Sequence, residues 1–181
     1  LPDTLCESDL PINLNGLPTG GLFSGTGVNN GMLDPDVGAV GNRIVTYTVI
    51  AGACTSAVSK TVYIKDAPEM NFRSGGISTN WKGVPTFYNC DSLSNTSTFT
   101  FFNQSFSTNY TSFTLDFGDN SPLLTGAVFP TNIGTGITHQ YSGYGLYPVT
   151  LTLHNTNGCD RSSLINVFFD KQPAVGFSIP G

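Results

Sequence analysis

Two carboxylates three residues apart, Asp116 and Asp119, are the nearest approach of this sequence to a reactive pair. A catalytic acid and base would need a cleft with opposed environments, whereas these two flank Gly118 in a stretch that predicts a tight turn. Asp in such turns usually accepts hydrogen bonds from the local backbone, so we favour a structural turn. The alternative is calcium, with Asn120 as a further ligand and with backbone and water completing a shell of about six to eight oxygens.

Four cysteines, Cys6, Cys54, Cys90 and Cys159, fall two in each half of the 181-residue chain. Without a Cys-x-x-Cys motif and with two histidines in the chain, a zinc site is disfavoured. Three disulfide pairings are open in principle. We favour Cys6–Cys54 with Cys90–Cys159, because each bond would close one half and stabilise it by about 4 kcal/mol in the chain-entropy model. Disulfides imply an oxidising compartment, and four free thiols in a cytosolic protein are the alternative.

Trp81 is the aromatic residue best placed for contact with a ligand such as a sugar, because residues 75–89 show no clear strand pattern. The competing interpretation is that it lies in a core, as most aromatic residues of a small β-sandwich do. Neither histidine has the spacing of a base beside a nucleophile, and Gly25-Thr26-Gly27 lacks the third glycine of a dinucleotide loop. We therefore predict no enzymatic activity and no cofactor apart from calcium.

The charge of the chain limits its partners. Charged residues make up 10% of the sequence, the net charge is −5, and the 7 Lys and Arg are scattered. Binding to a phosphate backbone needs clustered cations, so nucleic acid is not expected as a partner. No apolar run approaches the ~18 residues that cross a bilayer, so membrane insertion is not expected either. The first residue is Leu rather than Met, and we expect a piece of a longer protein.

Alternating apolar and polar residues predict strands throughout the chain. Val45, Tyr47 and Val49 share one face of a strand predicted over residues 42–50, and a second is predicted over 57–64. In the other half, residues 146–154 and 162–169 predict a hairpin that turns through Asn157-Gly158. Dense glycine around residues 20–31 fits short strands and tight turns rather than helix.

Module boundaries are predicted where one local pattern recurs. In residues 65–72 and again in 170–177, a strand ends at Asp, Pro follows within three residues, and Phe lies four beyond the Pro. Proline cannot donate to a sheet ladder, so it marks a break between modules. The pattern predicts a β-sandwich over residues 1–67, a second over 68–171, and the start of a further repeat over 172–181.

The second module resembles the PKD domain. The resemblance covers roughly residues 69–170 and rests on three motifs in order: Phe113 to Asn120, His139-Gln140-Tyr141, and Gly145 to Leu153. The family motif usually has Trp and Gly where this chain has Leu115 and Asn120. The resemblance implies an immunoglobulin-like sandwich that holds, spaces or binds, with a structural role for His139. Some PKD modules bind calcium, which the resemblance permits.

The first module is similar to small immunoglobulin-like repeats of Bacteroidota surface proteins, including gliding-motility adhesins of the SprB type. The matching residues are Cys6, the run from Gly20 to Val28, Leu33-Asp34-Pro35, Thr46-Tyr47 and Cys54. The resemblance implies type IX secretion and display on the cell surface. Asp3-Thr4-Leu5 and Asp91-Ser92-Leu93 also resemble the Bacteroidota O-glycosylation motif, which makes Thr4 and Ser92 candidate sugar attachment points.

Together these observations predict an all-β chain of two tandem immunoglobulin-like sandwiches. The predicted function is that of non-enzymatic structural or adhesive modules in a large secreted adhesin, serving gliding motility or surface attachment. Expected partners are neighbouring repeats of the same chain, surface polysaccharide or other cell-surface proteins. The expected location is the bacterial cell surface, associated with the outer membrane, or the medium. Two alternatives stay open: an accessory spacer or carbohydrate-binding region of a secreted hydrolase, and a subunit of an extracellular fibre.

Overall fold

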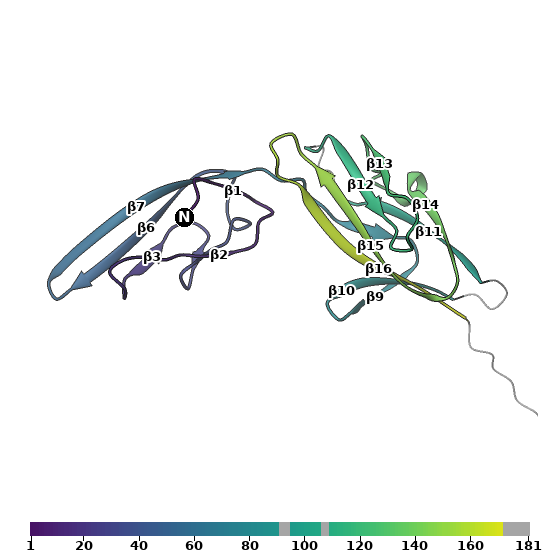
Figure 1. The fold of residues 1–181 in the computed structure, drawn as a ribbon, viewed down its shortest axis with the longest axis horizontal. Helices are drawn as coiled ribbons and strands as arrows, with labels where there is room; N and C mark the ends of the chain where they lie inside the picture. Colours follow the sequence, from purple (N-terminus) through teal and green to yellow (C-terminus); the bar gives the residue numbers. More distant parts are fainter. Residues whose placement is uncertain (91–94, 106–108, 172–181) are drawn as a thin grey trace, which may run out of the picture. The chain divides into compact units, whose positions relative to one another are not determined.

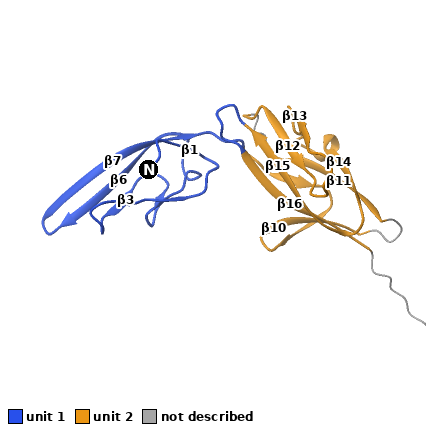
Figure 2. Cartoon of the chain, viewed as in Figure 1, with its two compact units in different colours: residues 1–68, 155–160 blue, residues 69–154, 161–181 orange. Residues whose placement is uncertain are grey.

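Strands dominate the computed structural model, which describes residues 1–90, 95–105 and 109–171 (Figure 1). In these ranges there is no α-helix, and one short 3-10 helix, η1, spans Ile133–Thr135. The predicted all-β fold class is confirmed. The chain divides into two compact units, coloured separately in Figure 2. Unit 1 comprises residues 1–68 and 155–160, and unit 2 comprises 69–154 and 161–181. The predicted start of a further repeat at 172–181 lies outside the described residues.

Unit 1 is a small sandwich of two sheets. In spatial order, the first sheet consists of β1 (Thr4–Cys6), β7 (Cys54–Lys65), β6 (Gly41–Ala51) and β3 (Leu22–Ser24). The second consists of β2 (Ile12–Asn13), β5 (Met32–Leu33) and β4 (Val28–Asn29). Leu33 from the second sheet packs with Val45, Val62 and Ile64 from the first. Four fully buried side chains make a small core, so other contacts must help to hold this unit.

Tyr47 is one of those contacts, and it explains two glycines of the first module, Gly16 and Gly21. Its hydroxyl donates to the Pro18 carbonyl at 2.6 Å and accepts from the Gly21 N–H at 2.9 Å. A Cβ added at Gly16 or Gly21 would lie within 2.5 Å of the Tyr47 ring. The glycine-rich loop therefore wraps directly on the tyrosine, and its backbone takes the space that side chains would need.

Arg43 is the second contact, buried to 5% exposure on β6. Its guanidinium donates to the backbone carbonyls of Ala39, Pro35, Val37 and Asp34 at 2.7–3.3 Å. One guanidinium thus donates to four backbone carbonyls of the loop over residues 34–39. The loop holds the sequence Asp34-Pro35-Asp36, where Asp34 Oδ1 accepts from the Asp36 N–H as turn residues commonly do.

Unit 2 is a larger sandwich. Its six-stranded sheet runs in the order β13 (Leu124–Gly126), β12 (Ser112–Asp116), β15 (Gly145–His154), β16 (Arg161–Asp170), β10 (Val84–Cys90) and β9 (Ile77–Trp81). Its three-stranded sheet consists of β14 (Ile137–Ser142), β11 (Thr96–Asn103) and β8 (Phe72–Ser74). Inward residues of both sheets form one core rich in aromatic rings, among them Phe87, Phe101, Tyr141 and Phe169.

Residues 75–89 differ from the irregular segment that the sequence predicts. They hold most of a hairpin, in which β9 pairs antiparallel with β10 from Ile77↔Tyr88 to Trp81↔Val84. Lys82 and Gly83 form its turn, both with positive φ. All five residues of β9 are exposed, so this edge strand carries no alternating pattern that would reveal it.

The disulfide pairing also differs from the prediction. Cys6 is bonded to Cys159, with Cα atoms 5.4 Å apart, while Cys54 and Cys90 are free and exposed. Cys6–Cys54 and Cys90–Cys159 are therefore wrong. Cys6 lies opposite Lys65, eleven residues from Cys54, and Cys90 lies opposite Asp170, eleven residues from Cys159. Within unit 1, Cys54 begins β7 and the partner of Cys6 ends it, so at about 3.3 Å per residue Cys6 and Cys54 are roughly 35 Å apart, too far for a disulfide.

The loop over residues 155–160 brings Cys159 to Cys6. It joins β15 to β16 but belongs to unit 1, in place of the two-residue turn predicted at Asn157-Gly158. Asn157 donates to the Asp66 carbonyl at 2.7 Å and accepts from Lys65 Nζ at 3.1 Å. Ser8 donates to the Asp160 carbonyl at 2.8 Å. These contacts hold the loop in place within unit 1 beside the sulfur atoms.

Candidate functional site

The predicted carboxylate pair lies in the turn that ends β12. Asp116 Oδ1 accepts from the Gly118 N–H at 2.9 Å, and Asp119 Oδ1 accepts from the Ser121 N–H at 3.1 Å. Both are the local backbone bonds expected of Asp in turns. Asn120 has φ +65°, a left-handed conformation that Asn tolerates better than most residues, which suits a position where the PKD motif usually has Gly.

Asp119 also contacts a histidine from the neighbouring sheet. Its Oδ2 lies 2.7 Å from His139 Nε2, and both side chains are 19% exposed. The imidazole stacks on Phe117 with ring centroids 3.8 Å apart, and Tyr141 meets it edge-on at 4.7 Å. Tyr141 in turn donates to the Phe117 carbonyl at 2.9 Å. The cluster ties the two sheets of unit 2 together.

The electrostatics of the cluster favour a fixed, ionised carboxylate. Burial raises the pKa of Asp119, but hydrogen bonds from Ser121 and His139 outweigh it and hold the pKa below the ordinary value of 3.8. Burial, with a smaller effect of the Asp119 charge, raises the pKa of Tyr141, so its hydroxyl stays a donor. A calcium ion would have to compete with His139 for Asp119. The described residues contain no group of three or more His, Cys, Asp or Glu suited to a metal, and calcium at Asp116, Asp119 and Asn120 stays a prediction.

Trp81 lies at a shallow apolar depression on the outer face of the six-stranded sheet. The depression has a volume of about 350 Å³ and is lined by Trp81, Thr86, Tyr88, Leu146 and Phe168. Tyr88 and Phe168 meet edge to face with centroids 5.7 Å apart. Trp81 is 44% exposed, so one part of its ring is open to solvent. The sequence also offers Tyr88 as an aromatic platform, but it does not single out Thr86, Leu146 or Phe168, which come from three strands.

Three lining residues contact polar or charged side chains. The Tyr88 hydroxyl accepts from Thr79 Oγ1 at 3.0 Å, and Asn166 Nδ2 donates to Thr86 Oγ1 at 3.3 Å. Lys82 Nζ lies 4.6 Å from the Trp81 ring centroid. Flat aromatic surface beside the Tyr88 hydroxyl is suited to an amphipathic ligand with an apolar face and a polar rim.

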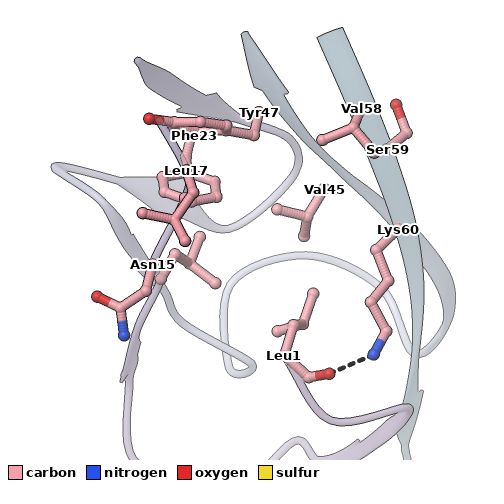
Figure 3. A pocket seen from close by; sticks show the side chains of 11 residues that line it. Leu1, Asn15, Leu17, Phe23, Val45, Tyr47, Val58, Ser59 and Lys60 are labelled. Carbon is pink, nitrogen blue, oxygen red and sulfur yellow. Dashed lines mark hydrogen bonds between the residues drawn. The ribbon is translucent and has the colours of Figure 1, made fainter. Parts of the chain in front are cut away.

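Unit 1 has a hollow of its own, about 250 Å³ in volume and lined mainly by apolar side chains (Figure 3). Phe23, Val45 and Tyr47 form one part of its lining, and Val58 and Lys60 of β7 lie across from them. Lys60 Nζ donates to the Leu1 carbonyl and lies 3.0 Å from Asp3 Oδ1. The lining strands β3, β6 and β7 belong to one sheet, and residues 14–17 with Leu1 complete the hollow, so it lies between that sheet and the segments that cross it.

Of the two candidate glycosylation residues, Thr4 and Ser92, the structure describes only Thr4. Thr4 lies exposed on β1, where a hydroxyl can be reached from solvent. Ser92 lies outside the described residues. Neither position is tested, and sugar attachment at Thr4 and Ser92 stays a prediction. Across the described ranges, no helix is long and apolar enough to cross a bilayer.

A family model described as the PKD domain matches residues 86–168. The match begins in β10 and ends in β16, and it includes the Asp116–Asn120 turn, His139 and Tyr141. PKD domains are commonly extracellular structural or adhesive modules and are typically not catalytic. That agrees with the sandwich fold of unit 2 and, together with the Cys6–Cys159 disulfide, is consistent with a secreted or surface protein.

Comparison with solved structures gives weaker likenesses. Dimeric latent PorU from Porphyromonas gingivalis is 13% identical over 83% of this chain, with a TM-score of 0.29, and this chain spans 14% of its length. A chimeric titin Z1Z2-Z1Z2 tandem carrying a GRGDS peptide from fibronectin is 8% identical over 92% of this chain and 93% of the titin chain, with a TM-score of 0.31. No curated protein matches. At these TM-scores neither structure supports an inference about function.

Proposed function

We propose that this chain is a pair of non-enzymatic structural and adhesive modules from a larger secreted cell-surface protein. The observation that carries the proposal is the match of residues 86–168 to the PKD domain. The Cys6–Cys159 bond supports it, because such bonds persist in oxidising compartments outside the cytoplasm. The modules would space and present other parts of the protein.

The chemistry of the described residues supports a holding role rather than turnover. Asp119 is engaged by Ser121 and His139, and Asp116 accepts from its own turn. A catalytic acid and base need environments that separate their roles and a cleft for substrate. This turn has neither, and its hydrogen bonds serve to fix the corner of the sandwich.

The proposed setting is the surface of a bacterium, in an outer-membrane-associated or released adhesin. The resemblance of residues 1–67 to repeats of SprB-type adhesins suggests gliding motility or surface attachment, with export by type IX secretion. Neighbouring repeats of the same chain would be the first partners, and surface polysaccharide or other surface proteins the second. Calcium at Asp116, Asp119 and Asn120 would stiffen the turn, and sugars at Thr4 and Ser92 would cover the surface.

Location is tested first. Antibodies raised against the 181-residue chain are applied to intact cells of the source organism, before and after brief treatment with an external protease. We expect binding to intact cells and its loss after the treatment. Binding that appears only after the cells are permeabilised would contradict the proposal.

The spacing role is tested by replacement. The region encoding this chain is exchanged in the parent gene for two unrelated immunoglobulin-like domains of similar length, and attachment to a surface is measured. Recovery of full attachment would show that length and stiffness suffice. Loss of attachment with normal display would show that this chain itself binds a partner.

A second candidate function, glycan contact, is favoured by the depression around Trp81. Its exposed indole, Tyr88 and Phe168 offer aromatic surface, and the Tyr88 hydroxyl adds a polar group. This would also suit an accessory region of a secreted hydrolase. Retention on insoluble polysaccharides is compared for the wild type, Trp81→Ala and, as a control, Leu123→Ala on an exposed loop. Equal retention of all three proteins would argue against this candidate.

A further inference from the structure

The Cys6–Cys159 bond closes a covalent loop that contains residues 7–158, because its two cysteines are 153 positions apart. Resting on the proposed role in a surface protein under load, we infer that this bond carries tension past the enclosed residues. Force entering at residue 1 passes along residues 1–6, crosses the two sulfur atoms and leaves through Cys159 and the residues that follow it. Strands β2 to β15 lie off this path.

The two strands that remain on the path can lengthen very little. β1 (Thr4–Cys6) leads into the bond, and β16 (Arg161–Asp170) leads away from it. A strand already rises about 3.3 Å per residue, against a limit of about 3.6 Å for a fully extended chain. Tension along these strands therefore stretches the backbone by roughly a tenth before covalent geometry resists.

The hydrogen bonds beside β16 are spared for the same reason. β16 pairs antiparallel with β15 from Arg161 to Phe169 and parallel with β10 from Asn166 to Asp170. Pulling one strand against its neighbour would shear these ladders. With the bond intact, force enters β16 from Cys159 and leaves beyond Asp170, so it runs along a single backbone. The neighbouring strands then bear little of the load and keep their packing.

The predicted disulfide pairing would have placed a different set of residues on the force path. Bonds between Cys6 and Cys54 and between Cys90 and Cys159 would leave residues 55–89 on the path, including most of β7 and all of β8 and β9. A chain without disulfides would place every element on it. The observed pairing leaves the shortest path that these four cysteines allow.

Single-molecule force spectroscopy on the whole chain, held at its two ends, tests the inference. The reference protein carries Cys54→Ser and Cys90→Ser, which remove the free thiols, and the matched variant adds Cys6→Ser and Cys159→Ser. We expect the variant to release an additional length that corresponds to the sequence separation of 153 between Cys6 and Cys159, roughly 540 Å at about 3.5 Å per residue. Release of that length by the reference protein, without reductant, would overturn the inference.

A second measurement keeps the test decisive if the matched variant fails to fold. Dithiothreitol supplies two electrons and two protons to the bond, gives two cysteine thiols and closes to its own cyclic disulfide. Adding it to the reference protein under constant force should produce the same total extra length, released as the two units unfold. Absence of that release, with loss of the bond confirmed by mass, would contradict the proposed path.

The outcome is separable from that of the proposed function. If the reference protein released the long extra length, the inferred load path would be wrong, while the proposed surface display would be unaffected. If antibodies bound only permeabilised cells, the proposed surface role would be wrong, whatever length the reference protein released.

Discussion

At the residue scale, buried polar side chains hold loops and sheets in place where the apolar core is small. Arg43 satisfies four backbone carbonyls in unit 1, and the Asp119–His139 pair with Tyr141 ties the sheets of unit 2. The backbone bonds of Asp116 and Asp119 follow from residue type and the nearby glycine. The role of Arg43 could not be predicted from residue type, because its acceptors are backbone carbonyls, which every residue has.

Arg43→Lys should lower the free energy of unfolding of unit 1 by about 3 kcal/mol, because a single ammonium cannot reach the carbonyls that the guanidinium fork satisfies. Urea denaturation followed by tyrosine fluorescence measures the change. Arg73→Lys is the matched control, since Arg73 lies half-buried over the Phe87 ring at 5.9 Å. Equal losses for the two variants would contradict the role given to Arg43.

Asp119→Asn should destabilise unit 2 at neutral pH by about 1 kcal/mol, because a charged acceptor of the His139 and Ser121 hydrogen bonds is lost. The folded-state pKa of Asp119 lies below 3.8, so its ionised form stabilises the fold above that pH. The contribution is lost as pH falls through the lowered folded-state pKa. The difference between wild type and variant should therefore shrink in acid, and a difference that grows there would refute this account.

At the element scale, strands with one buried face were predictable and edge strands were not. The alternation around Val45 and Tyr47 in β6 and around Val149 and Leu151 in β15 marks inward positions directly. β9 is exposed along its whole length, so its sequence carries no period, and its existence depends on pairing with β10. The depression around Trp81 could not be predicted either, since its lining comes from strands that are distant in sequence.

The glycine-rich loop of unit 1 offers a test at this scale. Gly21→Ala would place a Cβ 2.6 Å from the Thr48 carbonyl oxygen and 2.5 Å from the Tyr47 ring. We expect a loss of about 2 kcal/mol or more, as for other overpacked sites. Gly20→Ala, with φ +95° and open space, should cost only the backbone strain of about 1 kcal/mol. Thermal unfolding of the two variants gives the comparison, and a reversed order would be the contrary result.

At the scale of the whole molecule, the all-β class followed from composition and alternation, whereas the disulfide did not. Pairing by halves assumes that each module closes its own loop. The register of β1 on β7 rules this out in unit 1, because it places Cys6 opposite Lys65, at the far end of β7 from Cys54. The loop over residues 155–160 then supplies the partner, and no local sequence pattern assigns that loop to unit 1.

The number of reactive thiols checks this pairing. Denaturation without reductant and alkylation with iodoacetamide should label Cys54 and Cys90, and digestion should yield a peptide that joins Cys6 to Cys159. Reduction should also lower the free energy of unfolding by at most about 5 kcal/mol, the chain-entropy value for so long a loop. Four labelled cysteines without reductant would show that the bond does not form.

The Cys6–Cys159 bond has one more consequence, which concerns cleavage of the chain by proteases. A single cut anywhere within residues 7–158 opens the closed loop but separates nothing, since the two new ends belong to fragments that the sulfur atoms still join. A nicked molecule would have the mass of the intact chain plus one water until it is reduced, and residues 1 and 181 would stay covalently connected through the disulfide.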